Sequence, residues 1–219
     1  MPTKNDARRE LGDRTRQRLL RATRALLAER GAGAVHLRDV SEAAGVNVAA
    51  VSYHFGSLPN LVNTAVHEAV EAVLGEQARR LASLPPDAGL ADIVAAWIEP
   101  TVHGLQHDPG ERALLRIAAR AITDPPEELR EWVQDFLGRG HGQLIDRLRP
   151  ALPGLGEQEL AFRVFCIGGI VNRFCTAASL PESAAAASPE LPRLLVAAVT
   201  GMLAGLGNDA RGEIAQVVR

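Results

Sequence analysis

The chain has 219 residues, of which 47% are hydrophobic and 4% aromatic, and its formal net charge is −2. This length can bury one sizeable core or two smaller ones, and an apolar fraction made mostly of alanine, leucine and valine favours packed helices over a β-sandwich. The near-neutral balance excludes a protein that is basic throughout, as a general nucleic-acid binder would be.

The charge is unevenly distributed along the chain. Residues 1–60 carry ten basic and six acidic side chains, a net charge of +4, whereas the remainder carries 14 basic and 20 acidic ones, a net charge of −6. A basic N-terminal part followed by an acidic remainder predicts that only the N-terminal part binds a polyanion.

The sequence has no apolar leader and no long uncharged apolar run, so we expect a cytoplasmic protein with no membrane partner. Cys166 and Cys175 are nine residues apart, a spacing that suits no common metal motif. We interpret them as free, buried thiols in a reducing compartment. No cofactor is expected.

The first 60 residues predict a flexible arm and three helices. Residues 1–12 are polar and of mixed charge, which is typical of a loose arm. Apolar residues at helical spacing predict a helix over 13–30 that ends at Gly31. A short helix over 37–44 is closed by Gly45, and Asn47 can cap a third helix over 48–55.

The rest of the chain predicts further amphipathic helices separated by proline and glycine. We place them over 58–84, 88–107, 110–123, 126–150, 157–180 and 190–207. Pro100 predicts that the helix over 88–107 is kinked or split. Nothing alternates with a period of two, so the fold is predicted to be all-α, with an N-terminal domain over 13–57 and a larger domain over 58–219.

The two short helices around Gly45 predict a helix-turn-helix. Their apolar positions can pack on each other and on the first helix, which leaves the start and end of the third helix outside. A helix with small outward residues, ending in Tyr53 and His54, can enter a DNA major groove closely. The phenol and imidazole can then reach phosphates. The alternative is that both residues merely finish a surface helix.

At this point the residues resemble a known family, the tetracycline-repressor (TetR) family of bacterial transcription regulators. The motifs that carry the resemblance are Thr15-Arg16, Leu26-Leu27-Ala28-Glu29-Arg30-Gly31, Arg38-Asp39-Val40-Ser41-Glu42-Ala43-Ala44-Gly45-Val46 and Ala50-Val51-Ser52-Tyr53-His54-Phe55. They cover about residues 13–70, and the rest of the chain shares only a helical pattern with the family.

The resemblance implies a DNA-binding three-helix head, a fourth helix leading to a regulatory domain, and a homodimer with an effector cavity in each larger domain. We therefore expect a sequence-specific transcriptional regulator, a repressor, that a small-molecule effector releases from a palindromic operator on double-stranded DNA. The family pattern places base reading on Val48, Ala49, Ala50, Ser52 and Tyr53. It places phosphate contacts on Thr15, Arg38, Asn47, Tyr53, His54 and Ser57.

Three positions depart from the family pattern. The fourth helix usually begins with a Ser-Lys-Glu type sequence, whereas this chain has Leu58 where the lysine is expected. His36 precedes the second helix in place of the better capping residues threonine or serine. Ala32 follows Gly31 in place of an aromatic residue. The missing lysine removes one expected phosphate contact, which would flatten the salt dependence of binding by about one unit of slope.

The larger domain is less informative. Its last two helices are rich in small residues and, by the resemblance, pair across a two-fold axis in the dimer. Apolar, aromatic and arginine side chains give the candidate effector pocket: Trp97, Thr101, Ile117, Arg120, Trp132, Phe136, Phe162, Phe165, Cys166 and Arg173. A buried Arg120 or Arg173 would favour an acidic effector.

The sequence allows two further interpretations. Glu99, His103 and His107 share one helical face at a spacing that can hold a metal, but a solvated face is favoured and no metal site is assigned. An α-bundle enzyme is disfavoured, because the chain has no phosphate loop, no nucleophile elbow and no dense carboxylate pairs. A helix-turn-helix adaptor without an effector remains the alternative to the regulator.

Overall fold

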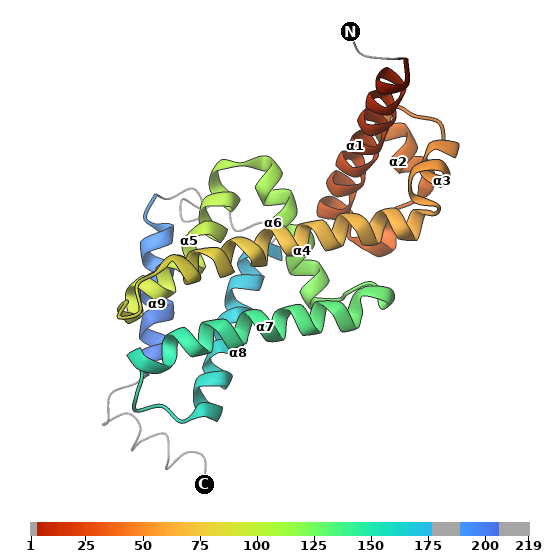
Figure 1. Ribbon diagram of the computed structural model, residues 1–219. Coiled ribbons are helices and arrows are strands. Elements are labelled where there is room, and N and C mark those ends of the chain that lie inside the picture. The colour runs from red at the N-terminus through yellow and green to blue at the C-terminus, as the bar shows by residue number, and fades with distance from the viewer. Residues whose placement is uncertain (1–3, 177–188, 206–219) are drawn as a thin grey trace. The chain divides into compact units, whose positions relative to one another are not determined.

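A computed structural model describes residues 4–176 and 189–205 of the chain (Figure 1). Over these ranges the protein is all-α, as predicted, with no strand. No helix of the described part is long and apolar enough to cross a membrane. The α-helices are α1 (Lys4–Arg30), α2 (Leu37–Ala44), α3 (Ala49–Phe55), α4 (Leu58–Ser83), α5 (Leu90–His107), α6 (Pro109–Thr123), α7 (Arg130–Leu148), α8 (Glu157–Thr176) and α9 (Leu191–Ala204).

Most predicted boundaries agree with the structure within a few residues, and the differences have local causes. Residues 4–12, predicted as a loose arm, form the first turns of α1. Pro100 lies inside α5, which continues to His107, so the predicted split does not occur; a proline removes one backbone hydrogen bond, and the buried neighbours Ile98 and Thr101 hold the helix in place. The predicted ends of the last two helices, 177–180 and 206–207, lie outside the described residues.

The chain divides into two compact units. The first comprises Met1–Val73 and Gly110–Gln134, and the second comprises Leu74–Pro109 and Asp135–Arg219. Helices α4 and α7 therefore contribute residues to both units. The domain limits over 13–57 and 58–219 stay a prediction.

The core of the first unit joins its three N-terminal helices, since α1 packs on α2 and α3, and α2 packs on α3. Leu20, Leu27, Val40 and Val51 are each 2% exposed or less. Burying one leucine or valine side chain contributes about 1.5–3 kcal/mol, so these residues hold the short helices α2 and α3, which are too short to be stable alone. The small core predicted from their spacing is confirmed.

The second unit is built around α5, which packs on α8 and α9. Its hydrophobic core includes Ile98, Leu144, Leu160 and Ile167. Cys175 is buried here, and burial raises the pKa of its thiol to about 12. The thiol is therefore protonated at neutral pH and is a poor nucleophile.

Four of the described helices end at a glycine with a positive φ, which only glycine adopts easily: Gly31, Gly45, Gly56 and Gly205. At all of these ends except Gly56, an arginine from another helix donates to one or two carbonyls, and a Cβ on the glycine would crowd its guanidinium. We call these pairs the arginine clamps. They are Gly31 with Arg120, Gly45 with Arg18, and Gly205 with Arg163. A cation at the C-terminal end of a helix is also favoured by the helix dipole.

The Arg120 clamp closes α1. The guanidinium of Arg120, on α6, donates to the carbonyl oxygens of Leu27 at 3.3 Å and Glu29 at 3.2 Å. A Cβ at Gly31 would lie 3.1 Å from Nη1 of this arginine. The C-terminus of α1 is thus fixed by a residue 91 positions further along the chain.

We expect Arg120→Met to lower the stability of the protein by about 1–3 kcal/mol, because it removes two charge-assisted hydrogen bonds at the end of α1. Thermal unfolding followed by circular dichroism would measure the loss as a lower Tm. The matched control is Arg130→Met, since the surface ion pair of Arg130 with Glu127 contributes little. Equal Tm values for the two variants would show that the clamp does not stabilise α1.

Candidate nucleic-acid interface and internal cavity

The turn between α2 and α3 is built from hydrogen bonds local to the sequence. The N–H of Gly45 donates to the carbonyl of Glu42 at 2.9 Å, and that of Val46 donates to the carbonyl of Ser41 at 3.0 Å, which is the Schellman arrangement. The side-chain oxygen of Asn47 then accepts from the N–H of Ala49 at 2.9 Å, so the predicted cap of the next helix is confirmed.

Arg18 fastens this turn from α1. Its guanidinium donates to the carbonyl oxygen of Gly45 at 3.0 Å, and a Cβ at that glycine would meet Nη2 at 2.7 Å. The helix-turn-helix is therefore held at a fixed angle to the first helix. Sequence reasoning counted Arg18 only as one of many basic residues, because nothing local distinguishes a clamping arginine from a solvated one.

The predicted base-reading residues are Val48, directly before α3, and four residues of α3 itself. Val48 is 41% exposed and Tyr53 83% exposed. Ala49 and Ser52 are also exposed, whereas Ala50 is half-buried. The structure thus leaves an outward surface with short side chains at its start and a phenol near its end.

The end of α3 is an aromatic cluster. The rings of Tyr53 and His54 meet edge to face, with centroids 4.9 Å apart, and His54 is half-buried. The guanidinium of Arg16 lies 5.1 Å from the ring centroid of Phe55, a cation–π contact from α1. These contacts leave the Tyr53 hydroxyl exposed on a segment that α1 supports.

The remaining predicted phosphate ligands have different local roles. Ser57 caps α4, because its Oγ accepts from the N–H of Asn60 at 3.2 Å; its hydroxyl proton is still available for a donor role. Thr15 donates its hydroxyl to the carbonyl of Leu11 at 3.0 Å, so it must give up this bond to donate to a phosphate. Arg38 is exposed on α2.

The structure brings together few of the predicted pocket residues. Trp97 lines a small cavity in the second unit, and Thr101 is buried near it. Ile117 is buried in the first unit, where Arg120 is occupied by its clamp. Trp132, also in the first unit, stacks on the His67 ring with centroids 4.0 Å apart.

Four pocket candidates come from α8, and three of them face outward. Phe162 is 66% exposed, Phe165 71% exposed, and Arg173 is also exposed. Side chains this exposed do not line a cavity within their own subunit, so this part of the prediction is wrong. The inner face of the helix is occupied instead by Leu160, Val164, Ile167 and Val171. Cys166 is half-buried, and Phe136 of α7 is half-buried under the guanidinium of Arg139.

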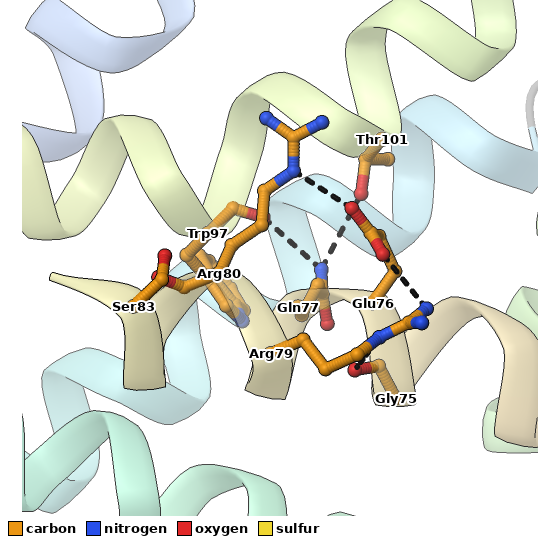
Figure 2. A network of polar contacts seen from close by, with 8 residues as sticks. All are labelled: Gly75, Glu76, Gln77, Arg79, Arg80, Ser83, Trp97 and Thr101. Atoms are coloured by element: carbon orange, nitrogen blue, oxygen red, sulfur yellow. Dashed lines mark hydrogen bonds and ion pairs between the residues drawn. The ribbon is translucent and has the colours of Figure 1, made fainter.

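The small cavity of the second unit has a volume of about 30 Å³. It is lined by Leu74, Gln77, Ala78, Leu81, Trp97, Leu137, Gly140, His141 and Gln143. Figure 2 shows the amide nitrogen of Gln77 directed at α5, where it donates to the Trp97 carbonyl at 3.2 Å and to the Thr101 hydroxyl at 3.3 Å. Sequence reasoning missed Gln77 and His141; their only signal is a polar residue within an apolar helical pattern.

Glu99, His103 and His107 are exposed on α5. The two imidazole rings stack with centroids 4.6 Å apart, and Nδ1 of His107 lies 3.2 Å from the carbonyl oxygen of His103. Among the described residues, no group of three histidine, cysteine or acidic side chains could hold a metal ion.

Two family models match the chain. The first, "Bacterial regulatory proteins, tetR family", matches residues 19–63. The second, "Tetracyclin repressor-like, C-terminal domain", matches residues 95–205, just over half of the chain. None of the curated proteins matches the sequence.

Solved structures of similar fold include TetR family regulators. PfmR of Thermus thermophilus is 18% identical with a TM-score of 0.63, over 95% of this chain and 100% of its own. A TetR family regulator of Marinobacter aquaeolei VT8 is 14% identical with a TM-score of 0.62, over 89% and 97%. GusR of Salmonella enterica is 21% identical with a TM-score of 0.55, over 86% and 95%.

These structures support the fold, and the family models support the assignment of both ends of the chain. The N-terminal match includes the helix-turn-helix described above, and the C-terminal match includes α5 to α9 over most of their length. The protein belongs to the TetR family of DNA-binding transcriptional regulators, which are not enzymes.

Proposed function

We propose that the protein is a homodimeric repressor that binds a palindromic operator through α3 and leaves it when a small-molecule effector binds the second unit. It acts in the cytoplasm on double-stranded DNA. The observation that carries the proposal is the outward surface of α3. Small residues there let the backbone approach base edges closely, and Arg18 and Arg16 hold the segment from α1.

Within this proposal, different residues of the surface do different work. Val48 and Ala49 contact thymine methyl groups, and Ala50, Ser52 and Tyr53 lie alongside base edges. The phosphate contacts come from Thr15, Arg38, Asn47, Tyr53, His54 and Ser57, and they fix the register of the protein on the duplex. The exposed arginines of α1 add an attraction that does not depend on base sequence.

The dimer is supported by an apolar face on α8 and α9. Phe162 and Phe165 are exposed on α8, and Leu194 is 62% exposed on α9. Ala197 and Gly201, also exposed on α9, follow Leu194 at helical spacing, and the two helices pack on each other. Large exposed apolar side chains are unfavourable in water, and a second copy related by a two-fold axis would cover the same face on both subunits.

The test is fluorescence anisotropy of the full chain on labelled DNA from upstream of its own gene, with random DNA as competitor and salt varied. A sequence-specific regulator should prefer the operator over random DNA by about a thousandfold or more. If random DNA displaces the protein from every upstream fragment, the result would favour the adaptor without sequence preference. Compounds from a library that release the protein from its operator would then be identified as effectors.

We expect Leu58→Lys to strengthen operator binding and to steepen its salt dependence by about 0.9 in the logarithmic slope, because it adds one phosphate contact at the start of α4. Leu58 is half-buried, and the aliphatic stem of lysine can keep part of its packing. The matched control is Leu58→Gln, which loses the same packing without gaining charge. An unchanged slope for the lysine variant would show that the start of α4 lies away from phosphate.

A further inference from the structure

The residues that line the small cavity of the second unit restrict the chemistry of a ligand that could bind there. The cavity lies among α4, α5 and α7, which supply all nine of its lining residues. A second hollow on this unit, of about 640 Å³, is lined by charged side chains that include Arg80, Asp92 and Glu99. That hollow is an open groove, whereas the small cavity is more enclosed and is bordered by the buried side chains of Gln77, Leu81 and Trp97, as small-molecule sites require.

Gln77 presents a fixed acceptor to this cavity. Its side chain is 7% exposed, and its amide nitrogen is occupied by the Trp97 carbonyl and the Thr101 hydroxyl. Because a carbonyl oxygen can only accept, the Trp97 contact fixes which end of the amide is nitrogen. The oxygen of Gln77 therefore points away from α5, as Figure 2 shows. A ligand group that meets this oxygen must be a donor.

The lining holds no fixed charge. Apart from Gln77, Gln143 and His141, every lining residue is apolar or glycine. Burial lowers the pKa of His141, so its imidazole is neutral at pH 7. An anionic or cationic ligand would lose its hydration without gaining a counter-charge, which is strongly unfavourable. This corrects the expectation of an acidic effector, since Arg120 is held in its clamp and Arg173 is exposed.

The wall formed by α7 is weak. Gly138, Gly140 and Gly142 occupy alternate positions inside this helix, and a Cβ added to any of them would meet nothing within 4 Å. Close packing in this structure therefore does not require these glycines, yet each weakens the helix relative to alanine. A cavity of about 30 Å³ holds little more than one water molecule, so an organic ligand can enter only if residues that line the cavity move.

We propose that the cavity is the effector site, that it takes an uncharged, mainly apolar molecule donating a hydrogen bond to the Gln77 oxygen, and that residues 138–142 of α7 move to admit it. That the ligand is an effector rests on the proposed function, whereas the position of the site and the chemistry of the ligand rest on the cavity alone. A flat ring system against Trp97 suits the lining best.

The experiment uses a pair of fluorescent probes with the full chain. N-phenyl-1-naphthylamine is uncharged, carries one N–H donor and fluoresces strongly in apolar surroundings; its 8-sulfonate has the same rings and donor with a permanent negative charge. We expect the neutral probe to bind at least tenfold more tightly, and its N-methyl derivative, which lacks the donor, to bind at least fivefold more weakly than the parent. Equal affinities in either comparison would overturn the corresponding part of the ligand assignment.

Two sets of variants locate the site. Ala78→Phe fills the cavity and should weaken the neutral probe at least tenfold, whereas Ala82→Phe, one turn along α4 on an exposed position, should leave its affinity unchanged. Gly138→Ala with Gly142→Ala leaves the lining intact; it should raise Tm and weaken the probe at least threefold. Unchanged probe affinity in the first variant would place the site elsewhere, and in the double variant it would exclude opening through α7.

Operator binding measured on the same samples separates the two proposals. If the wild-type protein binds its operator specifically but not the neutral probe, the cavity assignment fails and the proposed function stands. If the probe binds as described but no operator is bound, the proposed function fails and the ligand site stands. Release of operator DNA by the neutral probe, lost in Ala78→Phe and kept in Ala82→Phe, supports both.

Discussion

Phe165→Glu should convert the protein from a dimer to a monomer at micromolar concentration and weaken operator binding by roughly a hundredfold or more. Phe165 is 71% exposed on α8, so the substitution removes little packing within the subunit. At a two-fold interface it places two carboxylates where two rings would be buried, and uncompensated buried charge is strongly unfavourable. Operator binding falls because the second DNA-binding unit is no longer held close to its half of the operator, so the high effective concentration that the dimer provides is lost.

Light scattering after size-exclusion chromatography would give the mass, and anisotropy would give the operator affinity. Ala91→Glu is the matched control, because it adds the same charge at an exposed position on α5, which is not part of the apolar face of α8 and α9. This control should remain dimeric and bind DNA normally. A Phe165→Glu protein that is still dimeric would show that the apolar face of α8 does not form the interface.

The second large effect is expected at the end of α3. Tyr53→Ala and His54→Ala should each weaken operator binding about tenfold, which is the effect of losing one good contact worth about 1.4 kcal/mol. Because a phenol hydroxyl that contacts a phosphate carries no charge, the salt dependence of the Tyr53→Ala variant should change little. Tyr53 is 83% exposed, so its replacement should alter stability by less than about 0.5 kcal/mol.

Tyr53→Phe is the matched variant for this experiment, since it keeps the ring against His54 and removes only the hydroxyl. If the hydroxyl makes the contact, the phenylalanine and alanine variants should lose similar affinity. Anisotropy would measure binding, and thermal unfolding would measure stability. A marked fall in Tm for both alanine variants with operator affinity unchanged would mean that the two residues only finish a surface helix.

The helix-turn-helix could be predicted from the sequence because its determinants are local. Gly45 and Val46 end α2 through hydrogen bonds to residues three and five positions earlier, respectively, and Asn47 starts α3 through a bond to a residue two positions later. Turns and caps of this kind depend on a few adjacent residue types, so a short segment contains the whole cause. The bounds of α2 were predicted without error for the same reason.

The orientation of α8 could not be predicted, because both of its faces are apolar. Val164 and Ile167 face inward while Phe162 and Phe165 face outward, and helical spacing alone gives the phase of the pattern without saying which side meets the core. The larger aromatic residues were therefore assigned to the wrong side. Gln77 was missed because its partners lie 20 and 24 residues away on α5. At that separation a sequence pattern does not show which residues of two helices face each other.

The Arg120 clamp sets a limit on how this regulator can be recombined with others. A chimera that joins residues 1–57 to the body of another family member would keep Gly31 and its bond to the Leu27 carbonyl but lose the guanidinium that α6 supplies. The end of α1 would then be less firmly held, while α2 and α3 kept their own contacts. The transferable module is therefore discontinuous in the chain and must include the segment of α6 that bears Arg120, together with the four-helix N-terminal part with which it forms one compact unit.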